Sequence, residues 1–65
     1  MSEAEMELLV MLSETKLDLD TITATMMMIK QKEHGDILLR KFLNNTDKKT
    51  LTRNTILRKV QEILK

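Results

Sequence analysis

The chain has 65 residues, no cysteine and a single histidine, His34, so disulfides, thiolate metal sites and a histidine-based zinc site are excluded. A chain this short buries only about 60% of its unfolded surface, and without such supports it needs a partner chain. The net charge of +1 combines −5 over residues 1–20 with +6 over residues 21–65. That asymmetry is typical of solvated helix faces, of paired acidic and basic ends, or of a polyanion site.

The first predicted helix covers residues 2–13. Ser2 and Glu5 form a capping box, in which each side chain can accept a hydrogen bond from the backbone N–H of the other. The helix dipole favours the acidic residues of the first turn. The apolar run Leu8–Leu12 that follows covers more than one face of the helix.

The second predicted helix begins after Asp18, whose carboxylate can accept hydrogen bonds from free backbone N–H groups, with Asp20 as the competing cap. We expect this helix to end near residue 33 or 34, with Gly35 as its left-handed cap residue. Asp36 then caps a third segment over residues 37–44. The alternative is one helix over residues 18–44, because a glycine inside a helix costs only about 1 kcal/mol relative to alanine.

The second half of the chain alternates a helix, a loop and a helix. In the third segment we expect an inward face made of Leu38, Leu39, Phe42 and Leu43. Residues 44–50 are polar throughout and form the clearest loop. Thr52 caps the last helix, which is a one-faced surface helix with one apolar stripe made of Ile56, Val60, Ile63 and Leu64, with Leu57 at its margin.

The first two helices carry more apolar surface than one small core can hold. Leu8–Leu12 cannot all point inward, and the second helix is apolar nearly all round, so other elements must surround it. One interpretation places the second helix at the centre of the bundle. We favour a second interpretation, in which the first two helices form a homodimer interface. Methionine side chains are flexible and suit varied partners. The residues expected there are Leu9, Met11, Leu12, Met26, Met27 and Met28.

Enzyme chemistry, cofactors and metals are not expected. The chain has two serines without a nucleophile motif, one histidine base and no glycine-rich phosphate loop. His34 is typical of a solvated helix-end histidine rather than of a pH-sensitive site. The acidic set Glu14, Asp18 and Asp20 lacks the glycine and the spacing of a calcium loop.

We expect the protein to be cytoplasmic, without a secretory signal or a membrane span. The first residues are acidic, whereas a signal peptide begins with basic residues. The longest apolar run, Leu8–Leu12, is far shorter than the ~20 residues that span a bilayer.

The stretch from Leu51 to Leu64 resembles the recognition helix of bacterial helix-turn-helix regulators, with Thr52-Arg53 before Thr55-Ile56, then a basic pair and a spaced aliphatic stripe. The resemblance implies that the first helical turn meets base edges in DNA through Arg53, Asn54 and Thr55. It also implies phosphate contacts from Lys48, Lys49, Arg58 and Lys59. The other interpretation of the same stretch is an amphipathic surface helix with solvated bases.

The sequence therefore predicts an all-α chain, a compact bundle of three or four short helices in one domain over residues 1–65, paired as a homodimer. The function that we expect is a non-enzymatic protein-interaction module, regulatory or adaptor-like, that self-associates through its first two helices. The alternatives are a small DNA-binding regulator that uses the last helix, and a structural subunit of a larger assembly.

Overall fold

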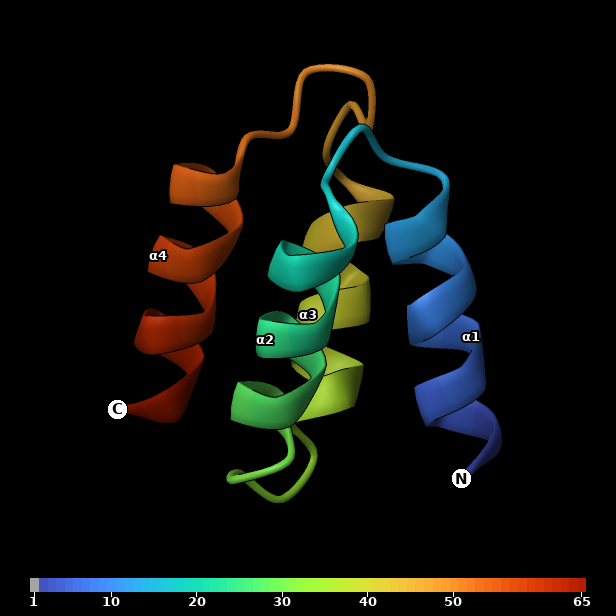
Figure 1. Ribbon diagram of the computed structural model, residues 1–65. Helices are drawn as coiled ribbons and strands as arrows, with labels where there is room; N and C mark the ends of the chain where they lie inside the picture. Colours follow the sequence, from blue (N-terminus) through green and yellow to red (C-terminus); the bar gives the residue numbers. More distant parts are fainter. Residues whose placement is uncertain (1) are drawn as a thin grey trace.

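The computed structural model describes residues 2–65, which form four helices and their connections. α1 (Glu3–Ser13), α2 (Leu19–Ile29), α3 (Gly35–Asn44) and α4 (Arg53–Leu64) alternate in direction, so the first turn of α1 and the last turn of α4 lie at the same end (Figure 1). Residues 2–65 contain no strand. The all-helical prediction is confirmed, with four helices rather than three.

The two outer helices, α1 and α4, are separated by α2 and α3. Each outer helix packs against both α2 and α3 (Figure 1). The backbones of α1 and α4, which both lie within the described residues, do not approach each other. Each outer helix therefore presents its own side of the bundle to solvent.

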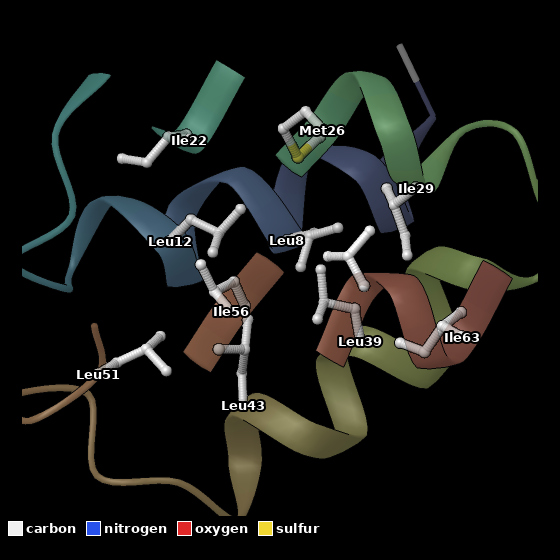
Figure 2. Packing of buried hydrophobic residues seen from close by; sticks show 11 residues of the cluster. Leu8, Leu12, Ile22, Met26, Ile29, Leu39, Leu43, Leu51, Ile56 and Ile63 are labelled. Atoms are coloured by element: carbon white, nitrogen blue, oxygen red, sulfur yellow. The ribbon is translucent and has the colours of Figure 1, made fainter. Parts of the chain in front are cut away.

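The core receives side chains from all four helices and from the loop before α4 (Figure 2). Its buried members are Leu8, Leu12, Ile22, Met26, Ile29, Leu39, Leu43, Leu51, Ile56, Val60 and Ile63. In α4 the buried residues recur at i, i+4 and i+7, the spacing that places side chains on one face. The predicted stripe is confirmed at these positions, while Leu57 and Leu64 are half-buried at its edge.

Three helices begin at the capping residues that the sequence predicts. Each cap side chain accepts a hydrogen bond from the backbone N–H three residues further on, at 3.2 Å for Ser2, 2.9 Å for Asp18 and 3.2 Å for Thr52. Asp18 rather than Asp20 therefore caps α2. These bonds satisfy N–H groups that have no partner inside the helix.

The turn between α2 and α3 differs from the prediction. α2 ends at Ile29, well before residue 33, and residues 30–34 form a turn, so one helix over residues 18–44 is also excluded. The residue in the left-handed conformation is His34, with φ 63°, and not Gly35. α3 begins at Gly35, so Asp36 lies in its first turn, where the carboxylate accepts a hydrogen bond from the adjacent Ile37 N–H at 2.9 Å. The prediction of Asp36 as the cap was wrong.

Gly35 is required for a close approach instead of a left-handed turn. A Cβ atom at this position would lie 2.8 Å from the carbonyl oxygen of Ile29 and 3.2 Å from its Cγ1. The turn folds so tightly over the last residue of α2 that any side chain at the start of α3 would collide with backbone. Glycine is the residue that permits such an approach.

The predicted inward face of α3 is partly wrong. Leu39 and Leu43 are buried, Phe42 is half-buried, and Leu38 is 42% exposed. Leu38 lies about 100° round the helix from Leu39, which turns it away from the core. It faces the side of α3 that lies next to α4.

Candidate protein-interaction surface

Exposed apolar side chains concentrate on the first two helices. Of the seven large apolar residues exposed among residues 2–65, five belong to α1 and α2, namely Met6, Leu9, Val10, Leu19 and Met27. The other two, Ile37 and Leu38, lie in α3, and none of the seven lies in α4. Contiguous exposed apolar surface of this kind is typical of interaction sites.

A shallow groove runs between α1 and α2. Its cavity of about 170 Å³ is lined by apolar side chains from both helices, among them Leu9, Leu19, Met26 and Met27. Lys30 is the charged residue of the lining, and its Nζ lies 3.7 Å from Glu5 Oε2. The lining of the groove is therefore mainly apolar, and its one charged side chain, Lys30, is already paired with Glu5.

A second groove lies on the other side of α1, against α3. Its cavity of about 490 Å³ is lined by Met6, Val10 and Met11 of α1 together with the ion pair between Glu7 and Arg40. With grooves on both sides and with Met6 55% and Val10 58% exposed, α1 presents apolar surface to solvent across its outer face. We call the exposed side chains of Met6, Leu9, Val10, Leu19 and Met27 the α1–α2 surface.

The structure divides the predicted interface residues among three environments. Leu9 and Met27 are exposed, at 38% and 66%, and Met11 and Met28 are half-buried. Leu12 and Met26 are buried in the core, at 0% and 8% exposure, and of the two only Met26, which also lines the α1–α2 groove, offers any surface to a partner. We expected the run Leu8–Leu12 to cover more than one face of the helix and placed Leu12 with Leu9 on the outer one, whereas helical spacing places Leu12 with Leu8 on the buried face.

The most exposed large apolar residue among residues 2–65 was missed. Leu19 is 76% exposed at the start of α2 and lines the α1–α2 groove. Met6 and Val10 were also missed, although they lie one helical turn apart on α1. An apolar residue directly after a helix cap, as Leu19 follows Asp18, is the signal that could have been used.

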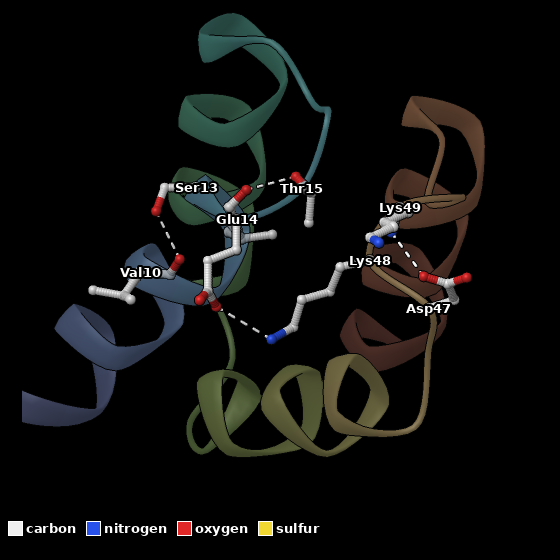
Figure 3. A network of polar contacts seen from close by, with 8 residues as sticks. Val10, Ser13, Glu14, Thr15, Asp47, Lys48 and Lys49 are labelled. Carbon is white, nitrogen blue, oxygen red and sulfur yellow. Dashed lines mark hydrogen bonds and ion pairs between the residues drawn. The ribbon is translucent and has the colours of Figure 1, made fainter.

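The glutamates of α1 hold this helix to the rest of the bundle. Glu5 pairs with Lys30, directly after α2, and Glu7 pairs with Arg40 of α3. Glu14, directly after α1, pairs with Lys48 of the loop before α4 at 3.2 Å (Figure 3). Because Glu5 pairs with Lys30, only the Ser2 half of the predicted capping box forms. Much of the negative charge of the first half is thus paired inside the chain.

The residues predicted to contact DNA do not form one free basic face. Arg53, Asn54, Thr55, Arg58 and Lys49 are exposed. Lys48 binds Glu14, and Lys59 lies 3.5 Å from Glu62 and 5.4 Å from the centre of the Phe42 ring. The basic side chains therefore point in several directions and are partly paired.

The connection before α4 also differs from a helix-turn-helix. Eight residues, 45–52, separate α3 from α4, and the two helices run in opposite directions side by side (Figure 1). In a helix-turn-helix, three or four residues join helices at roughly 90–120°. The resemblance of residues 51–64 thus does not extend to the geometry around them.

An acidic residue stands beside the first turn of α4. Hydrogen bonds from the Thr21 side chain and backbone N–H lower the pKa of the Asp18 carboxyl, and the nearby positive charge of Arg53 contributes to the same shift. Asp18 therefore carries its negative charge next to the turn that would have to approach DNA. A negative charge in that place opposes a phosphate backbone.

Within residues 2–65, no three side chains of the histidine, aspartate or glutamate types come close enough together to hold a metal ion. His34 is exposed in the turn before α3, 3.6 Å from Glu33. Over the same residues, each helix is too short or too polar to cross a bilayer.

Comparison of the chain with protein-family models, curated proteins and solved structures gives no match. The surface described above is therefore the basis of the functional argument.

Proposed function

We propose that this protein is a small non-enzymatic interaction module, regulatory or adaptor-like and cytoplasmic, that self-associates through the α1–α2 surface. The observation that carries the proposal is the concentration of exposed apolar residues on two neighbouring helices, while α4 exposes none of this class. Burying those side chains against a partner removes apolar area from water, which stabilises a complex by about 25 cal/mol per Å².

A second copy of the chain fits this surface by its charge. A twofold axis places the same patch of both copies in contact, so a charged patch repels itself and an uncharged one does not. The α1–α2 groove contains Lys30 as its charged lining residue, and Glu5 already pairs with it. The α1–α2 groove can therefore face its own copy without strong charge repulsion, and in the neighbouring groove Glu7 is paired with Arg40.

The area needed is compatible with the size of the chain. A stable dimer of ordinary size buries about 800 Å² on each partner. The chain exposes 4488 Å² in total, so such an interface covers roughly one-fifth of it.

Light scattering on a size-exclusion column tests the proposal. At micromolar concentration we expect about twice the chain mass of 7.6 kDa. Leu19→Gln combined with Met27→Gln is expected to give the monomer, since both side chains are exposed and their loss leaves the core intact. Ile37→Gln, an equally polar change at an exposed position of α3, is the matched control and should remain dimeric.

Two results would contradict self-association through these helices. The first is a wild-type monomer that binds no apolar dye at the same concentration. The second is a dimer that persists in the Leu19 and Met27 double variant but dissociates in Ile37→Gln. A monomer that does bind the dye would instead favour the structural-subunit alternative, in which a different chain covers the α1–α2 surface.

The second candidate is DNA binding through α4. The exposure of Arg53, Asn54 and Arg58 on this helix favours it. Polarisation of a labelled duplex at low salt is the direct test, with Arg53→Ala and Arg58→Ala as the informative variants. Binding that falls steeply with salt and weakens in both variants supports this candidate, and the absence of binding at low salt removes it.

A further inference from the structure

A third groove, between α3 and α4, differs from the other two in its charge. Its cavity of about 510 Å³ is bordered by four lysines, Lys32, Lys41, Lys59 and Lys65, against a single acidic residue, Glu62. It lies on the side of α3 that faces away from α1. We call it the α3–α4 groove.

The positive charge of this groove is only partly paired within the chain. Lys59 pairs with Glu62 at 3.5 Å, and the Nζ of Lys32 donates a hydrogen bond to the carbonyl oxygen of Lys65 at 3.1 Å. Among residues 2–65, neither Lys41 nor Lys65 has a carboxylate within 4.0 Å of its side-chain nitrogen. The groove therefore holds an excess of positive charge.

The arrangement of the helices explains this excess. The glutamates of α1 pair with bases of α2, α3 and the loop before α4, on their own side of the bundle. The backbones of α1 and α4 do not approach each other, and no residue of α1 lines the α3–α4 groove. The charge asymmetry of the sequence thus leaves its unmatched bases here.

The apolar part of the lining is made by Phe42, which is half-buried, Ile63, which is buried, and Leu38, which is 42% exposed. We call these three side chains the floor of the groove. The Lys59 ammonium lies 5.4 Å from the centre of the Phe42 ring, a position in which a cation is attracted to the ring face. A ligand that fits must therefore offer negative charge at its rim and an apolar group to the floor.

We propose that the α3–α4 groove binds an acidic peptide segment of another protein, in which apolar side chains alternate with carboxylates. Carboxylates would meet Lys41 and Lys65 at the rim, while an apolar side chain packs against Phe42. The groove and the α1–α2 surface lie on different sides of the bundle, so this site does not depend on self-association.

The acidic α1 of a second copy does not fit this groove as well as a separate peptide does. Glu5, Glu7 and Glu14 are already held by Lys30, Arg40 and Lys48. Each pair would have to break before its carboxylate could meet a lysine of another copy. A nucleic acid would match the lysines but would use an apolar floor with a single aromatic ring poorly, because single strands are bound on several stacking rings.

Fluorescence polarisation tests the site with a short labelled peptide in which glutamates alternate with leucines. We expect binding by the wild-type chain that weakens as salt rises, because exposed charges are screened. Lys41→Glu and Lys65→Glu should each weaken binding by about tenfold or more, since they place like charges against the peptide. Both lysines are exposed, so circular dichroism should find the fold unchanged.

Matched controls separate this site from nonspecific attraction. Lys49→Glu makes the same charge change in the exposed loop outside the groove, and binding should change by less than about twofold. The same peptide with serine in place of leucine should bind more weakly, because it leaves the floor uncovered.

Three results would overturn the proposal. Equal losses of peptide affinity in Lys41→Glu and Lys49→Glu would mean that the peptide is bound through the net charge of the chain and not at the groove. A serine peptide that binds as well as the leucine peptide would remove the role of the floor. A labelled oligothymidine that binds when the peptide does not, and that loses binding in Lys41→Glu, would assign the groove to nucleic acid instead.

Discussion

The outer helices α1 and α4 meet the same two neighbours but leave opposite surfaces in solvent. α4 buries one stripe, and its outer face carries polar and basic residues. α1 buries Leu8 and Leu12 and still exposes Met6 and Val10, while its glutamates are paired with the bundle. In a helix such as α4, the spacing of the apolar residues is enough to identify the buried face. For α1, the outer face is the informative one.

Substitutions on the two faces of α1 should differ most in their effect on the free energy of unfolding. Leu12 is fully buried, so Leu12→Ala should lower the free energy of unfolding by about 2–4 kcal/mol through lost burial and a cavity. Val10, 58% exposed on the other face, should change stability by less than about 0.5 kcal/mol when replaced by Gln. Urea denaturation monitored by circular dichroism measures both.

In an assay of self-association, the order of the two variants should be reversed, with the larger effect in Val10→Gln and the smaller one in Leu12→Ala. Val10→Gln is expected to weaken self-association on a size-exclusion column, because it places a polar group on the α1–α2 surface. If Val10→Gln instead destabilises the fold as much as Leu12→Ala, the outer face of α1 is part of a core, and the contrast with α4 is lost.

The next prediction concerns Gly35 in the turn between α2 and α3, the two helices that separate α1 from α4. Alanine usually stabilises a helix relative to glycine by about 1 kcal/mol. At Gly35 we expect the opposite, a loss of roughly 1–3 kcal/mol, because the new Cβ would lie 2.8 Å from the Ile29 carbonyl oxygen. Thermal melting followed by circular dichroism measures the change.

A control at the neighbouring position distinguishes collision from turn conformation. His34→Gly relieves a left-handed residue and should stabilise the chain by up to about 1 kcal/mol. A stabilising Gly35→Ala together with a destabilising His34→Gly would show that the turn between α2 and α3 has a different conformation.

The residues that sequence reasoning placed correctly are those whose partners lie close in the chain. The caps at Ser2, Asp18 and Thr52 need only a backbone N–H three residues away, and the α4 stripe needs only helical spacing. The close approach of Gly35 to Ile29 depends on how two helices meet, which local patterns do not contain.

The same limit applies to residues whose role depends on distant partners. Thr21 and Thr25 are both buried, at 1% and 0% exposure, because their side of α2 faces the other helices. The charge asymmetry was visible in the sequence. Its division into paired glutamates of α1 and unmatched lysines of the α3–α4 groove follows only from the order of the helices in space.

A smaller effect compares how the two outer helices begin. Thr52→Ala removes the cap of α4 and should cost about 1 kcal/mol, because it frees a backbone N–H in a helix whose first turn follows the buried Leu51. Ser2→Ala removes the matching bond of α1 close to the chain end, where fraying already limits its value, so the loss should be smaller. Equal losses of stability in urea would argue against this difference.

The ion pairs of α1 should contribute less than the caps. Arg40 and Glu7 are partly exposed, so Glu7→Gln should cost less than about 1 kcal/mol and the cost should shrink at high salt. Glu3→Gln, an exposed acid of the same helix, is the matched control, and its salt-dependent effect should be limited to the interaction of a first-turn acid with the helix dipole. A loss in Glu7→Gln that does not depend on salt would mean that Arg40 acts through packing rather than charge.

The smallest effect concerns the acid dependence of the α2 cap, next to α4. Hydrogen bonds from Thr21 lower the pKa of Asp18 below its ordinary value of 3.8 in the folded chain. A lowered pKa contributes stability that is present above 3.8 and is lost as pH falls through the folded value. Asparagine caps a helix about as well as aspartate, so Asp18→Asn should match the wild type at neutral pH.

Below pH 3.8 the wild type should lose part of the stability that Asp18 contributes, whereas Asp18→Asn has no charge to lose at this position. The fall in melting temperature from neutral to acid pH should therefore be smaller in the variant. Parallel pH profiles of the two chains would mean that the Asp18 charge, including its attraction to the nearby positive charge of Arg53 at the first turn of α4, adds nothing to the fold.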